Sequence, residues 1–154
     1  MSVFRRLATL LAIFAAVFIM ACNSTDSAAT SESEPNNNAD KADKITVGTT
    51  LTAEIQAEGD GIDKDYYKFK AEAGETYLIR TRYTSDSTDT KMSLWDFAGD
   101  DVDPLDQNDD IDEDGEDYNA GIEWTCETSG TYYFIVSGFE DDEEGSYKVS
   151  VTKE

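Results

Sequence analysis

From residue 35 onward, hydrophobic and polar residues alternate along several short segments of the chain. The clearest segment is 145–152, where Tyr147, Val149 and Val151 alternate with polar residues. A period of two is that of a β-strand with one buried face. Similar patterns predict further strands over 50–57, 66–71, 75–83, 91–97 and 121–126.

The segment 130–137 differs because it is apolar at both alternating sets of positions, which predicts a central strand buried on both faces. Glycine, aspartate and asparagine separate the predicted strands at roughly ten-residue spacing. Residues 36–43 are expected to form one turn of helix at most. About seven or eight short strands of this kind predict an all-β fold, an antiparallel β-sandwich of jelly-roll type.

The first residues follow a different pattern. Arg5 and Arg6 precede an apolar run over 7–20, which is shorter than the roughly 20 residues of a membrane-spanning helix. A basic start, a short apolar core and small residues at its end predict a signal peptide. Residues 19–22, Ile-Met-Ala-Cys, resemble a bacterial lipobox, which implies cleavage before Cys22 and acylation of that cysteine. An ordinary signal peptide and an uncleaved anchor are the alternatives.

These patterns predict three regions: a lipoprotein signal peptide at 1–21, a flexible tether at 22–33 and a sandwich domain at 34–154. The tether is rich in serine, threonine and alanine and has no hydrophobic pattern. Asn23 follows the cysteine, and it is not the aspartate that resembles inner-membrane retention in enterobacteria. We therefore expect export to the cell envelope and anchoring in the outer membrane.

The charge of the chain narrows its partners and its chemistry. It has 34 acidic and 12 basic residues, for a net charge of -22. This charge repels phosphate backbones and anionic headgroups, so we expect no nucleic acid and membrane contact only through the lipid. There is no histidine, which removes the commonest general base and the most frequent zinc ligand. We expect no enzymatic activity, and a hydrolase using carboxylates is the alternative.

Several segments then resemble, in order, one known family. They read Glu-Pro-Asn-Asn-Asn-Ala at 34–39, Gly-Thr-Thr-Leu at 48–51, Asp-Lys-Asp-Tyr-Tyr-Lys-Phe at 63–69, Ala-Gly-Glu-Thr-Tyr at 73–77, Leu-Trp-Asp at 94–96, Asn-Asp-Asp at 108–110, Gly-Thr-Tyr-Tyr at 130–133 and Gly-Ser-Tyr at 145–147. This set resembles the bacterial pre-peptidase C-terminal (PPC) domain, a β-sandwich module appended to many secreted peptidases. The resemblance covers 34–154. Two features depart from the family: no catalytic domain precedes the segment, and 99–119 is longer and more acidic than the pattern requires.

Oxygen-bearing residues alternate just before this domain. Alternate residues of an extended chain project to one side, so Glu32, Glu34 and Asn36 can converge. In collagen-binding relatives of the PPC family, a Glu-x-Glu-x-Asn linker and acids on a nearby turn hold Ca²⁺, an ion that prefers oxygen ligands. The resemblance therefore implies a calcium site of these three residues, with candidate ligands on the turn at Asp60, Asp63 and Asp65. Solvated linker acids beside an aspartate-capped turn are the alternative.

A second acidic motif lies in the segment 99–119, which is longer and more acidic than the PPC pattern requires. Asp110, Asp112 and Asp114, followed by Gly115, match the first half of an EF-hand loop. Gly121 stands where the bidentate glutamate of such a loop is required. The motif is either a weak metal site or an acidic hairpin loop.

Two further features concern a partner and a thiol. Arg80 and Arg82 share one strand face, and with Tyr66 and Trp95 they are a candidate binding surface; salt bridges to the acidic surface are the alternative. Cys126 is expected to be a buried thiol, with a disulfide or a nucleophile as alternatives.

We thus expect a lipid-anchored, calcium-binding extracytoplasmic module that binds a protein or polysaccharide without catalysis. The alternative is a stand-alone accessory domain of an exported peptidase or secretion system.

Overall fold

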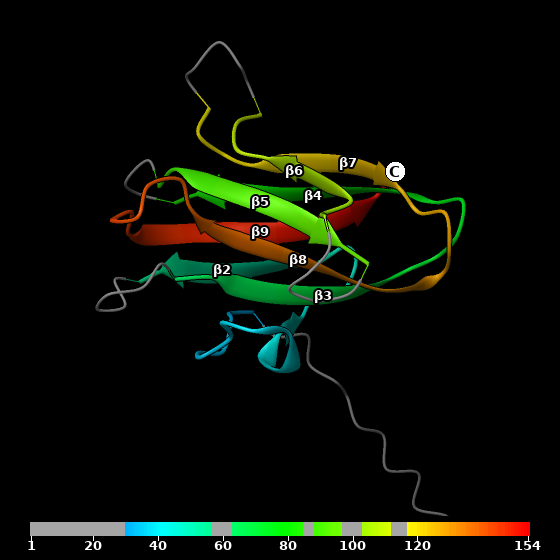
Figure 1. Cartoon of the computed structure of the whole chain (residues 1–154), viewed down its shortest axis with the longest axis horizontal. Coiled ribbons are helices and arrows are strands. Elements are labelled where there is room, and N and C mark those ends of the chain that lie inside the picture. Colours follow the sequence, from blue (N-terminus) through cyan, green and yellow to red (C-terminus); the bar gives the residue numbers. More distant parts are fainter. Residues whose placement is uncertain (1–29, 57–62, 85–87, 97–102, 112–116) are drawn as a thin grey trace, which may run out of the picture.

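The alternating segments form the strands of two facing β-sheets in this computed structural model (Figure 1). The structure describes residues 30–56, 63–84, 88–96, 103–111 and 117–154. The strands are β1 (Asp43–Lys44), β2 (Thr50–Ile55), β3 (Asp65–Ala71), β4 (Thr76–Tyr83), β5 (Thr90–Trp95), β6 (Asp106–Asn108), β7 (Gly121–Thr125), β8 (Gly130–Gly138) and β9 (Gly145–Lys153). Within these ranges no helix is long and apolar enough to cross a bilayer. The expected all-β sandwich is confirmed.

One sheet has the strand order β1-β3-β8-β5-β6, and the other has the order β2-β9-β4-β7. Neighbouring strands are antiparallel, except that β1 pairs with β3 in parallel. β8 is the middle strand of its sheet, which confirms the central position predicted from its apolar residues.

The alternating apolar residues meet between the sheets. Tyr147, Val149 and Val151 of β9 are each 0% exposed, as the period of two predicts. Tyr67 of β3 stacks on Phe134 of β8 with ring centroids 5.0 Å apart. Full burial of side chains of this size contributes about 1.5–3 kcal/mol each, so this layer supplies most of the driving force for folding.

Two short strands were not predicted. β1 and β6 contain only two and three residues, which is too few to show a period of two. β6 lies inside the acidic segment 99–119, where no strand was predicted, and it pairs with β5. The single expected helical turn is η1 (Ala39–Lys41), where the side chain of Asn38 accepts a hydrogen bond from Lys41 N at 3.2 Å.

The side of the sandwich next to η1 is where the site lies. β2 is an edge strand of one sheet, and β1 is an edge strand of the other. The chain from Thr30 to η1 passes this side, next to β2 and β3 (Figure 1).

Candidate metal site

The segment 30–36 is held against both sheets by backbone hydrogen bonds. Glu32 N donates to Thr52 O of β2, and Thr52 N donates to Thr30 O, each at 3.0 Å. At the other end of the segment, Tyr66 N of β3 donates to Asn36 O at 3.2 Å. The segment therefore bridges β2 of one sheet and β3 of the other, and its alternate side chains, Glu32, Glu34 and Asn36, lie on the side of the gap between them.

Three carboxylates meet there. Glu32, Glu34 and Asp65 each offer an oxygen, and these oxygens lie within 4.8 Å of one another. Asp65 is fully buried at the start of β3, whereas Glu34 lies at the surface. Asn36 completes the group and is 0% exposed. The expected convergence of alternate residues in the linker is what the structure shows, and one acid of the turn joins it.

The side-chain amide of Asn36 lies among these acceptors. One end of the amide is 3.3 Å from Glu34 Oε1 and 3.1 Å from Asp65 Oδ1. The structure places Oδ1 at that end, while Nδ2 donates to Glu32 Oε2 at 3.4 Å. Three oxygens then face one another, and a cation between them, a proton on a carboxyl group or a rotated amide that donates to both carboxylates would satisfy them.

Two tyrosines connect the carboxylates through the core. Tyr67 OH lies 2.7 Å from Glu32 Oε2, the two tyrosine hydroxyls are 2.8 Å apart, and Tyr147 OH lies 2.5 Å from Asp65 Oδ2. This chain has three contacts, but two hydroxyls supply only two protons. With both carboxylates ionised, one contact lacks a proton, so the network favours an additional proton.

The pKa values of the two tyrosine-linked carboxyl groups agree with the need for an additional proton. Burial, opposed by the Tyr67 and Glu54 hydrogen bonds, raises the pKa of Glu32 to about 7. Burial and the nearby Glu32 carboxylate raise the pKa of Asp65 to about 9. In the absence of a cation, Asp65 is therefore mainly protonated at pH 7 and Glu32 is about half protonated. A group of carboxylate oxygens that lie this close together, one of them on a fully buried side chain, can hold a metal ion.

Of the other two expected ligands of the turn, the structure describes one, and it is not among the three carboxylates that meet. Asp63 is buried and its Oδ2 accepts a hydrogen bond from Gln56 N at 2.8 Å, which ties the turn to the end of β2. Asp60 lies outside the described residues. Sequence reasoning missed Tyr67 and Tyr147, because their inward positions marked them only as core residues.

The second expected metal motif is only partly described. Asp110 is described, whereas Asp112 and Asp114 lie outside the described residues. Near Asp110, burial and then the carboxylates of Asp110 and Glu143 raise the pKa of Asp89 to about 6. This end of the sandwich therefore gathers negative charge from three loops.

The expected four-residue binding surface is divided in the structure. Arg80 and Arg82 project from β4 on the outer face of the β2-β9-β4-β7 sheet. Tyr66 and Trp95 belong to β3 and β5, in the opposite sheet. Strands of both sheets alternate with the same period, so the sequence does not show which outward residues share a face.

The structure describes one of the two cysteines. Cys126 is a free thiol, 1% exposed, and its Sγ donates to Thr128 O at 3.1 Å. The expected buried thiol is confirmed. Cys22 and the expected signal peptide lie outside the described residues.

The sequence matches no protein-family model and no curated protein. The fold is similar to solved structures. The PPC domain of a Bacillus anthracis collagenase superposes with a TM-score of 0.54 and 18% identity, over 71% of this chain and 93% of that one.

Two other structures share the fold. Aeromonas hydrophila PliG, a periplasmic inhibitor of g-type lysozyme, has a TM-score of 0.51 at 17% identity, over 73% of this chain and 99% of its own. CorA, a surface-associated copper-binding protein of Methylomicrobium album BG8, has a TM-score of 0.53 at 10% identity, over 71% and 97%. Identities this low show a common fold, and the fold is PPC-like, as the sequence motifs implied.

Proposed function

We propose that this chain is a lipid-anchored, extracytoplasmic binding module in which a calcium ion fastens the N-terminal segment to the sandwich. The observation that carries the proposal is the meeting of Glu32, Glu34 and Asp65 between the two sheets. The module has no catalytic role and presents its sandwich to a protein or polysaccharide.

The donor set supports calcium over softer metals. It consists of carboxylate and amide oxygens only, because the chain has no histidine and the described cysteine, Cys126, lies in the core. Glu32, Glu34, Asn36 and Asp65 would hold the ion, with water completing a shell of six to eight oxygens. The ion would supply the positive charge that the tyrosine-linked carboxylates lack.

The site's position gives the ion a structural role. Glu32 and Glu34 belong to the segment that leads from the proposed tether, whereas Asp65 begins a core strand. An ion bound to all three links the tether to the sandwich and fixes the domain relative to the bilayer. The lipobox at 19–22 supports acylation of Cys22 as the other end of this connection.

Calorimetric titration of the full chain, purified in detergent, tests the proposal. We expect Ca²⁺ to bind with one-to-one stoichiometry and to raise the melting temperature, by mass action on the folded state. Glu34→Gln should weaken binding at least about tenfold, because a ligand charge is lost. The matched control is Glu123→Gln, which alters an exposed glutamate on β7, at the opposite edge of the same sheet from β2. An unchanged melting temperature between EDTA and millimolar calcium would reject the calcium clamp.

A further inference from the structure

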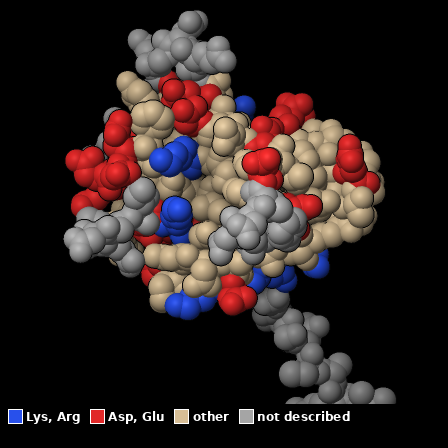
Figure 2. Space-filling model, viewed as in Figure 1, with Lys and Arg blue, Asp and Glu red and all other residues tan. Residues whose placement is uncertain are grey.

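Basic residues gather on one face of this acidic chain. Of its 12 lysines and arginines, five lie on or beside the outer face of the β1-β3-β8-β5-β6 sheet. We call this surface the lysine face; its basic residues are Lys44, Lys64, Lys68, Lys70 and Lys91. In Figure 2, basic side chains lie in the mainly uncharged hollow of this face, and acidic side chains lie around its margin.

Aromatic residues lie beside the lysines. The strand register places Trp95 of β5 opposite Tyr133 of β8, and Tyr133 opposite Lys68 of β3. Lys68 in turn is next to Lys44 of β1. Because neighbouring strands are about 4.8 Å apart, this row of two aromatic residues followed by two lysines extends roughly 14 Å across the sheet.

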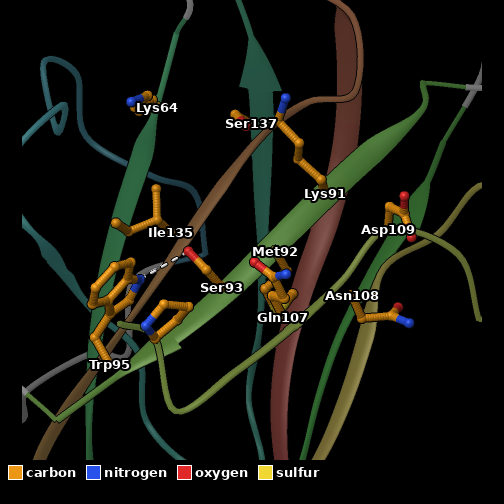
Figure 3. Close-up of a pocket in the computed structure, with 11 residues that line it drawn as sticks. Lys64, Lys91, Met92, Ser93, Trp95, Gln107, Asn108, Asp109, Ile135 and Ser137 are labelled. Atoms are coloured by element: carbon orange, nitrogen blue, oxygen red, sulfur yellow. Dashed lines mark hydrogen bonds between the residues drawn. The ribbon is translucent and has the colours of Figure 1, made fainter. Parts of the chain in front are cut away.

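A groove of about 570 Å³ crosses the same face. Its apolar end contains Trp95, whose indole Nε1 donates to Ser93 Oγ at 2.8 Å, so the ring is held in place. Lys64 and Lys91 lie at the other end, with Ile135 between (Figure 3). The polar side chains that line the groove include Ser93, Gln107, Asn108 and Ser137.

The lysines keep donors for a ligand. Lys64, Lys68, Lys70 and Lys91 form no ion pair with any carboxylate in the described parts of the chain. Lys91 Nζ donates to Phe139 O at 3.1 Å, and Lys70 Nζ donates to Thr131 Oγ1 at 2.5 Å. Each ammonium has three donors, so two remain on each of these side chains.

We propose that the lysine face binds an acidic polysaccharide, which deepens the proposed function by assigning the surface and the ligand class. The partly exposed rings of Trp95 and Tyr133 offer flat apolar surfaces to sugar rings, and the lysines pair with carboxylates along the polymer. Amides and hydroxyls in the groove suit a ligand rich in hydroxyl groups. At physiological salt, charges beyond about 8 Å are screened, so the ligand experiences the lysines rather than the net charge of -22.

The test uses the full chain in detergent with polygalacturonate and, as the uncharged match, its methyl ester. Calorimetry at physiological salt should show binding to the acid polymer and little or none to the ester, and 0.5 M salt should weaken the binding. Equal binding to both forms, or no binding to the acid form, would overturn the inference. Equally tight binding of polyglutamate or single-stranded DNA would also overturn it, because the sugar would then contribute nothing.

Surface variants locate the binding. Lys68→Glu with Lys91→Glu should weaken binding at least about tenfold, and Trp95→Ala about fivefold, with melting temperature confirming that each variant folds. Lys148→Glu makes the same kind of charge change on the outer face of the other sheet and should leave affinity unchanged. An equal loss in Lys148→Glu would show charge attraction without a site. Polymer binding that persists without a calcium response would reject the clamp alone, and a calcium response without polymer binding would reject this inference alone.

Discussion

Replacing Asp65 by asparagine should change stability in opposite directions with and without calcium. Asparagine keeps the size of the side chain and a carbonyl oxygen that can accept the hydroxyl of Tyr147, which donates to Asp65 at 2.5 Å. The replacement removes the charge that burial disfavours. It also removes a carboxylate that we propose as a calcium ligand.

The pKa of Asp65 gives the magnitude. It rises from 3.8 to about 9 in the folded protein without a cation, first because of burial and then because of Glu32. At pH 7 the unfolded chain releases this proton and the folded chain keeps it. This lowers the free energy of unfolding by about 1.4 kcal/mol for each of the roughly three pH units between the pKa in the unfolded chain and pH 7. Asp65→Asn should therefore stabilise the calcium-free protein by up to about 4 kcal/mol. At roughly 3–4 °C per kcal/mol, the melting temperature should rise by about 10 °C or more.

Circular dichroism melting at pH 7, in EDTA and in millimolar calcium, is the assay. In EDTA the variant should melt above the wild type, and in calcium it should lose the upward shift that the wild type shows. Asp40→Asn, at an exposed position in η1, is the control and should change neither value by much. The reasoning is refuted if Asp65→Asn melts below the wild type in EDTA, since Asp65 would then stabilise the fold without a cation.

Three further predictions follow from the same contacts. In EDTA, the free energy of unfolding should fall as the pH rises from about 4 through the raised pKa values of about 7 for Glu32 and 9 for Asp65, because the folded state holds the extra protons. In saturating calcium this fall should disappear. A free energy of unfolding that rises with pH in EDTA would contradict the assigned pKa shifts. Gly145→Ala should destabilise the protein by about 2–4 kcal/mol in urea unfolding, since Gly145 has φ +148° and a Cβ there would lie 2.2 Å from Thr88 Oγ1. A loss of less than about 1 kcal/mol in the free energy of unfolding would contradict this, because the backbone would then relax easily around the added methyl group. Cys126 should react with a thiol reagent only on unfolding, as it is 1% exposed, and rapid labelling of the folded protein would contradict its burial.

Much of the fold could be predicted from the sequence because the sheets are buried on one face. Alternation marked the inward residues of β9, and the doubly apolar run marked β8 as central. Alternation does not show which strand belongs to which sheet. Arg80 and Tyr66 are both outward, yet they lie on opposite sheets, so the expected common surface was divided.

The candidate site was predictable only in part. Glu32, Glu34 and Asn36 converge because alternate residues of an extended segment share a side, which the sequence shows directly. The choice among the aspartates of the turn depends on the exact start of β3, and that start selects Asp65. Tyr67 joins the site through a hydroxyl that crosses the core, and no local sequence pattern reports such a contact.

A crystal structure of the chain grown in calcium tests the central claim most directly. We expect density for one ion between the sheets, with oxygens of Glu32, Glu34, Asn36 and Asp65 at about 2.3–2.6 Å, the usual range for calcium. The contrary result is a site without an ion, in which the amide of Asn36 is rotated to donate to Glu34 and Asp65 and the carboxyl groups hold their own protons.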